Sequence, residues 1–317
     1  MSHYGNSYWI LTPQMEGRLY KIIDLSGTDW FDFTHWSGRF VYNLSIDLRP
    51  GSYYNPLLNY DYGYRLQISA RTIIENVASG AGNDRIITNN ANNKILAGDG
   101  HDRVWALAGN DLIAGGAGDD RLFGGDGNDR IAGNAGVDVI YGGTGRDKLS
   151  GGTYADYLFG GRGNDVLIGN EGQDRLYGGA GADRFVFNEV MFKYTGDSTI
   201  LDPDLNKPSF TQNTETPVAA PDHIFGFDNP GNARGDVIDL SAIDANINGH
   251  PFPTFNEGFV FRGIGPGPDV RDLYLREEGT NTIVYGNTYA PYAPDFKIVI
   301  VDGAARAWEY TALDFVL

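Results

Sequence analysis

A nine-residue period runs through the middle of the chain and restricts its fold more than any other feature. Twelve consecutive units follow one another without insertion from Ser79 to Val186. The eighth position of every unit is apolar, and a glycine-rich stretch precedes most of the sixth positions. An apolar residue in a short extended segment after each turn predicts one strand per unit, with the eighth side chain pointing inward. Two units then form one coil, so the period predicts a solenoid.

The predicted fold class is all-β: a parallel β-roll of six stacked coils, with two parallel sheets and turns along both edges. The 44 glycines in 317 residues agree with this prediction, because they suit many turns and few long helices. The roll is expected to have β-rich segments on both sides. The expected regions are an aromatic-rich flank packing on the roll at 1–78, the roll at 79–186, an exit strand and polar loop at 187–221, and a β-rich C-terminal region at 222–317.

The sixth position of the unit carries a carboxylate in every unit but one, which has Asn93. Calcium is a hard cation that takes six to eight oxygen ligands from carboxylates and backbone carbonyls. Glycines in the turns permit positive φ, which can aim carbonyls inward, and stacked coils bring together aspartates such as Asp102 and Asp120. We therefore predict several calcium ions between coils. The predicted ligands are Asp84, Asp102, Asp111, Asp120, Asp129, Asp138, Asp147, Asp156, Asp165, Asp174 and Asp183.

Some turns depart from the pattern and are expected to bind calcium poorly. Asn93 removes a charge, while Ala91 and Tyr154 replace the glycine of the fourth position. The turn "ALAGND" lacks the leading pair of glycines. We therefore expect fewer than the ten sites between coils that six stacked coils allow.

The repeats resemble those of RTX proteins, whose calcium-binding consensus is G-G-x-G-x-D-x-U-x. The flanks resemble the C-terminal domain of serralysin-type metalloproteases. The segments that carry this second resemblance are "GTDWFDFT" at 27–34, "TIIENVASGAGND" at 72–84, "GADRFVF" at 181–187, "DHIFGFD" at 222–228 and "GDVIDLSAID" at 235–244. The resemblance covers roughly residues 19–317, which is most of the chain.

The serralysin resemblance implies a further calcium near the entry to the roll. In that family two aspartates of a "DxGGxD"-like segment help to hold it, and Asp24 and Asp29 in "DLSGTD" occupy those places, although Ser26 departs from the pattern. The ending "ALDFVL" is similar to the acidic-then-hydrophobic terminus by which the family is exported through type I secretion. The chain begins without a basic stretch followed by an apolar run. We therefore expect an extracellular or cell-surface protein without an N-terminal signal peptide.

Several function classes are excluded by what the sequence contains. The net charge of −17 gives no electrostatic basis for binding nucleic acid or an anionic membrane, and no stretch is long and apolar enough to span a bilayer. The absence of cysteine rules out disulfides and thiolate metal sites. No two of the five histidines have the H-E-x-x-H spacing of zinc proteases, and no serine lies in G-x-S-x-G. We expect a protein without enzymatic activity.

The ninth position of alternate units carries a run of large apolar side chains that the consensus does not require. After Ile87 these residues are Trp105, Phe123, Tyr141, Phe159 and Tyr177, which we call the aromatic ladder. Ninth side chains point outward if eighth side chains point inward, so one sheet should present this ladder with one ring per coil. Two interpretations stay open: the flanks of the chain cover the ladder, or it docks a protein or glycan partner.

The sequence therefore predicts a calcium-binding secreted or surface protein whose β-roll folds on calcium and acts as a structural, adhesion or assembly module. Stacked aspartates should repel one another and keep the calcium-free roll disordered. Two alternatives remain: a calcium-dependent glycan-binding module, and the non-catalytic C-terminal part of a serralysin-like protease. Self-assembly is also possible on this sequence.

Overall fold

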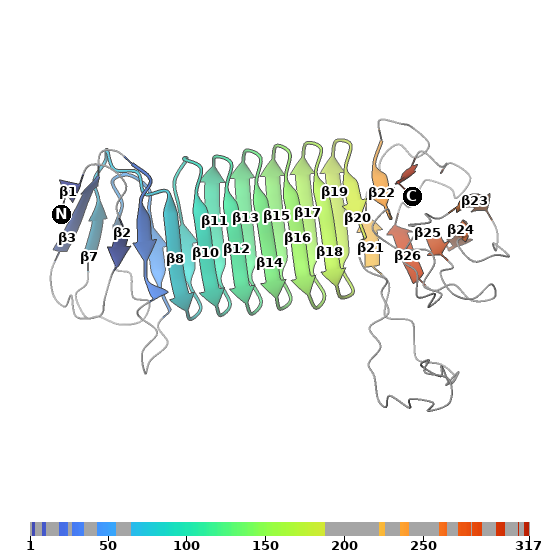
Figure 1. The fold of residues 1–317 in the computed structure, drawn as a ribbon, viewed down its shortest axis with the longest axis horizontal. Coiled ribbons are helices and arrows are strands. Elements are labelled where there is room, and N and C mark those ends of the chain that lie inside the picture. The colour runs from blue at the N-terminus through green and yellow to red at the C-terminus, as the bar shows by residue number, and fades with distance from the viewer. Residues whose placement is uncertain are drawn as a thin grey trace, which may run out of the picture.

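The computed structural model of the protein is drawn in Figure 1. It describes residues 2–3, 8–10, 19–24, 27–34, 43–54, 65–187, 222–225, 235–240, 260–264, 272–279, 281–286, 296–301, 310 and 314–316. Within these residues the secondary structure is almost entirely strand, and no helix is long and apolar enough to cross a membrane.

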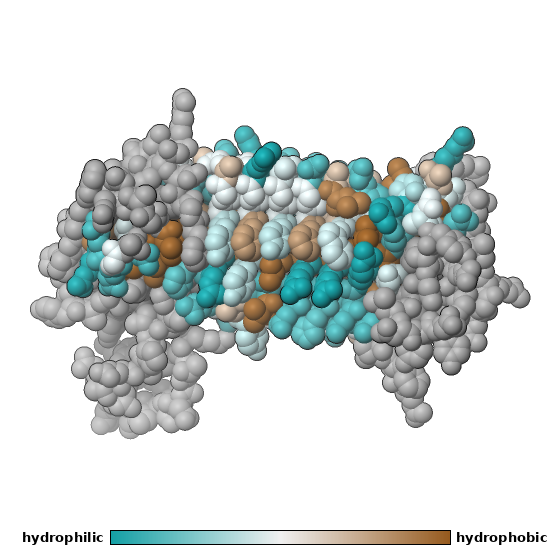
Figure 2. Space-filling model, turned by 180° about the vertical axis from the view of Figure 1, so that it is seen from behind, coloured by the Kyte–Doolittle hydropathy of each residue, from teal (hydrophilic) through white to brown (hydrophobic). Residues whose placement is uncertain are grey.

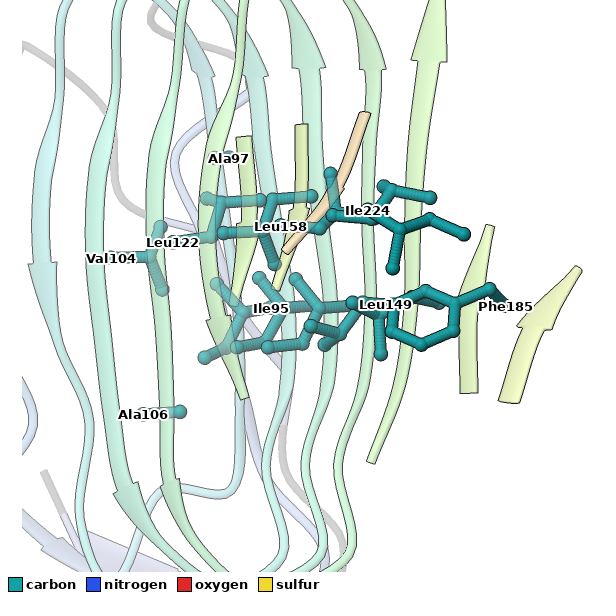
Figure 3. Close-up of a cluster of buried hydrophobic side chains, with 14 of the residues drawn as sticks. Ile95, Ala97, Val104, Ala106, Leu122, Leu149, Leu158, Phe185 and Ile224 are labelled. Atoms are coloured by element: carbon teal, nitrogen blue, oxygen red, sulfur yellow. The ribbon is translucent and has the colours of Figure 1, made fainter. Parts of the chain in front are cut away.

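The eighth positions of the units form the core of the roll, as predicted. Ile95 and Ile113 point inward from one sheet, Val104 and Leu122 point inward from the other, and all four are almost completely buried. Figure 3 shows the two rows of side chains facing each other between the sheets. Each unit contributes one large apolar side chain to this core, so the core is thin.

Strands that are one coil apart pair in parallel with a constant register of eighteen residues. Ile95 pairs with Ile113 in one sheet, and Val104 pairs with Leu122 in the other. The inward side chains therefore stack directly over one another along the roll. Figure 1 shows the strands lying side by side in this order. This arrangement confirms the predicted parallel β-roll.

The first sheet has eleven strands, all parallel. In spatial order they are β2 (Tyr8–Ile10), β4 (Trp30–Asp32), β8 (Asn76–Ala81), β10 (Lys94–Asp99), β12 (Leu112–Ala117), β14 (Arg130–Ala135), β16 (Lys148–Thr153), β18 (Val166–Glu171), β20 (Arg184–Val186), β22 (Val237–Asp239) and β27 (Phe315–Val316).

The second sheet has twelve strands, and two of its pairings, β24 with β25 and β25 with β26, are antiparallel. In spatial order they are β23 (Val260–Ile264), β24 (Asp272–Glu278), β25 (Asn281–Gly286), β26 (Phe296–Val301), β21 (Asp222–Phe225), β19 (Arg175–Ala180), β17 (Tyr157–Arg162), β15 (Val139–Thr144), β13 (Arg121–Asp126), β11 (Arg103–Ala108), β9 (Arg85–Ile87) and β5 (Ser45–Asp47).

The described strands of both flanks continue these two sheets beyond the repeat. On the N-terminal side β4 pairs with β8 and β5 pairs with β9, so Phe31 and Ile46 extend the two inward rows. On the C-terminal side β21 pairs with β19 and β22 pairs with β20. The flanks thereby cover both ends of the thin core. A separate four-stranded sheet lies at the N-terminal end, in the order β1 (Ser2–His3), β3 (Leu19–Asp24), β7 (Arg65–Ile68) and β6 (Tyr53–Tyr54).

The second and fourth positions have a backbone with positive φ in all the turns except that of residues 88–93, where they are Asn89 and Ala91. Glycine provides it in most units, and the same geometry leaves no room for a side chain. A Cβ at Gly143, for example, would lie 2.0 Å from the carbonyl oxygen of Gly125 in the preceding coil. Four non-glycine residues nevertheless keep positive φ at these positions, namely Leu107, Asn134, Tyr154 and Asn170. The register of the roll thus overrides the local preference of these residues.

Tyr154 is the clearest case for a stabilising substitution, because its φ is 79° and its side chain is 67% exposed. Tyr154→Gly should increase the free energy of unfolding by about 0.5–1 kcal/mol, since relief of left-handed strain exceeds the entropy cost of glycine. Urea unfolding at saturating calcium measures this change. Gly163→Ala, at the same position of the next unit, is the opposite control and should destabilise, because its Cβ would lie 1.5 Å from the Gly145 carbonyl oxygen. A Tyr154→Gly protein no more stable than the parent would contradict the assignment of strain.

Candidate metal-binding turns

The aspartates of the sixth position form one row along each edge of the roll. Their side chains lie inside the turns, and each of these residues is at most 2% exposed. The first edge carries Asp84, Asp102, Asp120, Asp138, Asp156 and Asp174, and the second edge carries Asn93, Asp111, Asp129, Asp147, Asp165 and Asp183. The structure thus brings together the residues that the sequence predicted as calcium ligands, although their role as ligands stays a prediction.

One carboxylate oxygen of each aspartate joins successive coils. Oδ1 of Asp120 accepts the backbone N–H of Asp102 at 2.8 Å, and Oδ1 of Asp138 accepts that of Asp120 at 2.8 Å. The same bond recurs along both edges with nitrogen–oxygen distances of 2.6–2.9 Å. These bonds to a charged acceptor fix the stacking of the turns.

The second carboxylate oxygen of these aspartates is buried and accepts no hydrogen bond. This holds for Asp102, Asp111, Asp120, Asp129, Asp138, Asp147, Asp156 and Asp165. A buried charged oxygen without a partner costs several kcal/mol, so such atoms are rare in folded proteins and call for a ligand or a proton. A repeated set of them along both edges suits the binding of cations or protons.

The unpaired oxygen packs close against the glycine of the first position. A Cβ added to Gly133 would lie 2.1 Å from Oδ2 of Asp138 and 2.8 Å from the carbonyl oxygen of Gly151 in the next coil. A carboxylate oxygen and a carbonyl oxygen therefore converge on one point, which we call the cradle of the turn. The same pair of oxygens surrounds the first-position glycine in six units, which begin with Gly115, Gly124, Gly133, Gly142, Gly151 and Gly160.

The donor set of the cradle suits calcium. It contains only oxygen, which hard divalent cations prefer, and it combines carboxylate with backbone carbonyl as calcium sites do. Within the described residues no three acidic or histidine side chains converge on one point. Backbone carbonyls would therefore supply much of the coordination, and the residues that would hold the ion are the sixth-position aspartates and the first-position carbonyls.

The free carboxylates are strongly perturbed in this environment. Burial raises the pKa of Asp138 to about 7, against a hydrogen bond from the Asp120 backbone that lowers it, and the nearby Asp120 carboxylate raises it further. Burial likewise raises the pKa of Asp156 to about 8 and that of Asp102 to about 6. Without a cation the folded roll therefore favours protonated carboxyl groups.

The turn of residues 88–93 is closed without a carboxylate. Nδ2 of Asn93 donates to the carbonyl oxygen of Glu75 at 2.9 Å, and Nδ2 of Asn89 donates to that of Ile74 at 2.7 Å. Oδ1 of Asn89 accepts the backbone N–H of Ala91 at 2.9 Å. Side-chain amide N–H groups thus donate hydrogen bonds to carbonyl oxygens of the preceding coil. This agrees with the expectation that Asn93 and Ala91 mark a poor calcium site.

Two acidic residues outside the repeat continue the second edge, and the sequence analysis did not identify them. Oε2 of Glu75 accepts the backbone N–H of Asp29 at 2.8 Å, and Oδ1 of Asp236 accepts that of Asp183 at 2.8 Å. Asp236 is completely buried. Each is followed two residues later by a buried apolar residue, Val77 or Ile238, which repeats the spacing between the sixth and eighth positions. That spacing is the signal in the sequence that identifies them.

The predicted entry site involves Asp24 and Asp29. Asp29 is 1% exposed, precedes β4, and receives backbone and side-chain hydrogen bonds from Asn76 on its carbonyl oxygen. Asp24 ends β3, but its side chain lies outside the described residues. The calcium site implied by these two residues therefore stays a prediction.

The aromatic ladder forms on the outer face of the second sheet, as predicted. Successive rings are nearly parallel, with interplanar angles of 1–13° and centroid separations of 4.5–5.6 Å. Arg85 lies over the ring of Trp105 at 5.1 Å. None of the five rings is buried, and Tyr141 is 37% exposed. Figure 2 looks onto this face, where brown and pale side chains alternate along the roll.

Comparison with known proteins identifies the repeat. Residues 79–113, 114–149 and 150–185 each match the family model described as the RTX calcium-binding nonapeptide repeat (4 copies). RTX calcium-binding repeats are therefore present in this chain, and the match is confined to the roll. No curated protein matches the chain. The resemblance of the flanks to serralysin-type proteases stays a prediction from their motifs.

The raised pKa values predict that protons partly replace calcium. Because each folded-state pKa lies above the ordinary aspartate pKa of about 3.9, the stability of the metal-free roll is largest below that pH. It should fall as the pH rises through about 6 to 8, the pKa values of Asp102 and Asp156. Circular dichroism in chelator should therefore show β structure at low pH that disappears toward high pH.

Asp120→Asn should mimic one such protonation and stabilise the chelated roll at neutral pH, because it removes a buried charge and keeps an oxygen for the Asp102 N–H. Asp119→Asn is the matched control, because the neighbouring Asp119 carboxylate is 60% exposed. A chelated roll whose β content does not change with pH would contradict the assignment of these carboxylates.

Proposed function

We propose that the chain is an extracellular or cell-surface structural module whose β-roll folds when calcium binds between its coils. The observation that carries this proposal is the set of buried aspartate oxygens without hydrogen-bond partners, aimed at carbonyl oxygens across the cradles. The RTX repeats agree with it, because the match and the cradles occupy the same residues. We also propose that several calcium ions bind and that the module has a partner.

The buried carboxylates and the small apolar core together make folding depend on bound metal. Each unit of the roll buries one large apolar side chain, while nearly every unit also buries one carboxylate. Like charges repeat at each coil, so the calcium-free chain gains too little from its core to offset their desolvation and repulsion. An ion that binds only the folded state shifts the equilibrium by mass action, and at a hundred times its dissociation constant one site contributes about 2.7 kcal/mol.

Because folding depends on calcium, the chain would be exported in an unfolded form. Where free calcium is scarce the roll would stay open, and where calcium is plentiful the cradles would fill and the coils would stack. Type I secretion rests on the resemblance of "ALDFVL" to the family ending. Phe315 and Val316 also form β27, which pairs with β22, and Phe315 is buried there.

The aromatic ladder supports a structural role and favours a protein partner over a glycan. Sugars pack against the flat face of an aromatic ring, but here each inner ring has a neighbouring ring on both faces. The surface of the ladder therefore consists of ring edges. Edges of stacked rings form a flat apolar strip, which suits another protein surface, including a second copy of the chain.

Removal of calcium is the direct test of the proposed function. Circular dichroism at neutral pH should show a disordered roll in chelator and a large gain of β structure on addition of calcium, whereas magnesium at the same concentration should fold it poorly because it requires a stricter geometry. The control is a chelator titration back to the starting spectrum. Identical spectra with and without calcium would refute the proposal.

Truncation of the central ring tests the contribution of the ladder. Tyr141→Ala removes two stacking contacts and should lower the free energy of unfolding in calcium by about 1–3 kcal/mol. Tyr154→Ala, at an exposed tyrosine outside the ladder, should not destabilise. Light scattering on the same proteins reports self-association. Unchanged stability together with lost association would assign the ladder to docking rather than to the roll.

A further inference from the structure

The first position of the nine-residue unit divides the turns into two kinds. In the later units it is glycine, and the carboxylate oxygen occupies the space where a Cβ would stand. In the first four units it carries a side chain, because these units begin with Ser79, Thr88, Ala97 and Ala106. The cradle is therefore open in one group of turns and filled in the other.

In the first two units a hydroxyl group satisfies the carbonyl that faces the cradle. Oγ of Ser79 donates to the carbonyl oxygen of Ala97 at 2.5 Å, and Oγ1 of Thr88 donates to that of Ala106 at 2.7 Å. The corresponding carbonyl in the Gly133 turn is that of Gly151, which faces the Asp138 carboxylate. A hydroxyl group thus satisfies the carbonyl that, in the glycine turns, converges with a carboxylate oxygen.

In the next two units a methyl group occupies the cradle. Ala97 and Ala106 are completely buried, and Figure 3 shows them apart from the two rows of large side chains, toward opposite ends of the strands. In the six glycine turns the aspartate oxygen lies only 2.1–2.6 Å from the position of a Cβ. The methyl groups of Ala97 and Ala106 leave no room for a carboxylate oxygen at that point, so the second oxygens of Asp102 and Asp111, although buried without a hydrogen-bond partner like the others, lie away from the cradle.

The N-terminal coils have other means of stability. Amides of Asn89 and Asn93 close one turn onto the preceding coil. Phe31 and Ile46 of the N-terminal flank join the same core as Ile86 and Ile95. Lys94 also lies over the ring of Trp30 at 5.4 Å. This end of the roll therefore depends on hydrogen bonds and apolar packing.

We infer that calcium binds only from the Gly115 turn onward and that the four turns of residues 79–114 are built without metal. The inference rests on the proposed function and specifies which part of the roll calcium controls. The N-terminal coils then form a folded platform, and calcium extends the roll from it toward the C-terminus.

Hydrogen exchange measured by mass spectrometry on the full chain, in chelator and in calcium, tests this division. We expect the strands β9, β10 and β11 to stay protected in chelator, while β13 to β18 lose protection and regain it with calcium. Equal loss of protection in both groups would overturn the inference but leave the proposed function intact. A chain that binds no calcium would refute both.

A matched pair of substitutions tests the cradle directly, with bound ions counted by native mass spectrometry. Ala106→Gly opens a filled cradle and should add one calcium ion, whereas Gly133→Ala fills an open cradle and should remove one. If the Gly133→Ala protein does not fold, the ion count of Ala106→Gly and the hydrogen-exchange pattern still test the inference. An Ala106→Gly protein that binds no additional calcium would contradict the assignment of the cradle as the metal site.

Discussion

The burial of a carboxylate at nearly every turn is the constraint on which the rest of the structure depends. One oxygen of each aspartate accepts a backbone N–H from the preceding coil, which sets the register of the stack. The other oxygen is left in a space bounded by a carbonyl oxygen of the following coil. A carboxylate buried there needs a cation or a proton, so the same side chain is a structural bond and, in the proposed function, a calcium-dependent switch.

Glycine is required for this arrangement for two different physical reasons. At the second and fourth positions the backbone has positive φ, and the roll tolerates exceptions such as Tyr154 at some strain. At the first position the reason is space, because a Cβ would meet the carboxylate. The consensus treats these glycines alike, although exceptions at the first position alter the cradle itself.

The flanks cover the two ends of the apolar core, which the repeat alone would leave exposed. A stack of coils with one apolar layer exposes that layer at both ends, and unpaired strand edges invite association. β4 and β5 close one end, while β21 and β22 close the other. Asp239 of β22 also binds Arg184 of the last repeat strand through its Oδ2. These flanking strands pair with the terminal strands of the roll and so belong to its two sheets.

Much of this architecture could be predicted from the sequence because a strict period leaves few choices. The register of Ile95 with Ile113 and the stacking of Phe123 on Tyr141 follow from the interval between alternate units. The continuation of the edge by Glu75 and Asp236 could not be read so easily, because long intervals separate Asp29 from Glu75 and Asp183 from Asp236. Neither interval repeats the period, so only folding brings these residues into line.

The sequence by itself determined the period, the inward apolar row and the placement of one acid per turn, because each depends only on local alternation and turn chemistry. The tertiary structure alone decided that the residue at the first position lines the cradle. That depends on how closely the Gly133 Cα, the Asp138 carboxylate and the Gly151 carbonyl approach one another across two coils. The stacking of coils sets these distances, so the sequence of a single nine-residue unit does not reveal them.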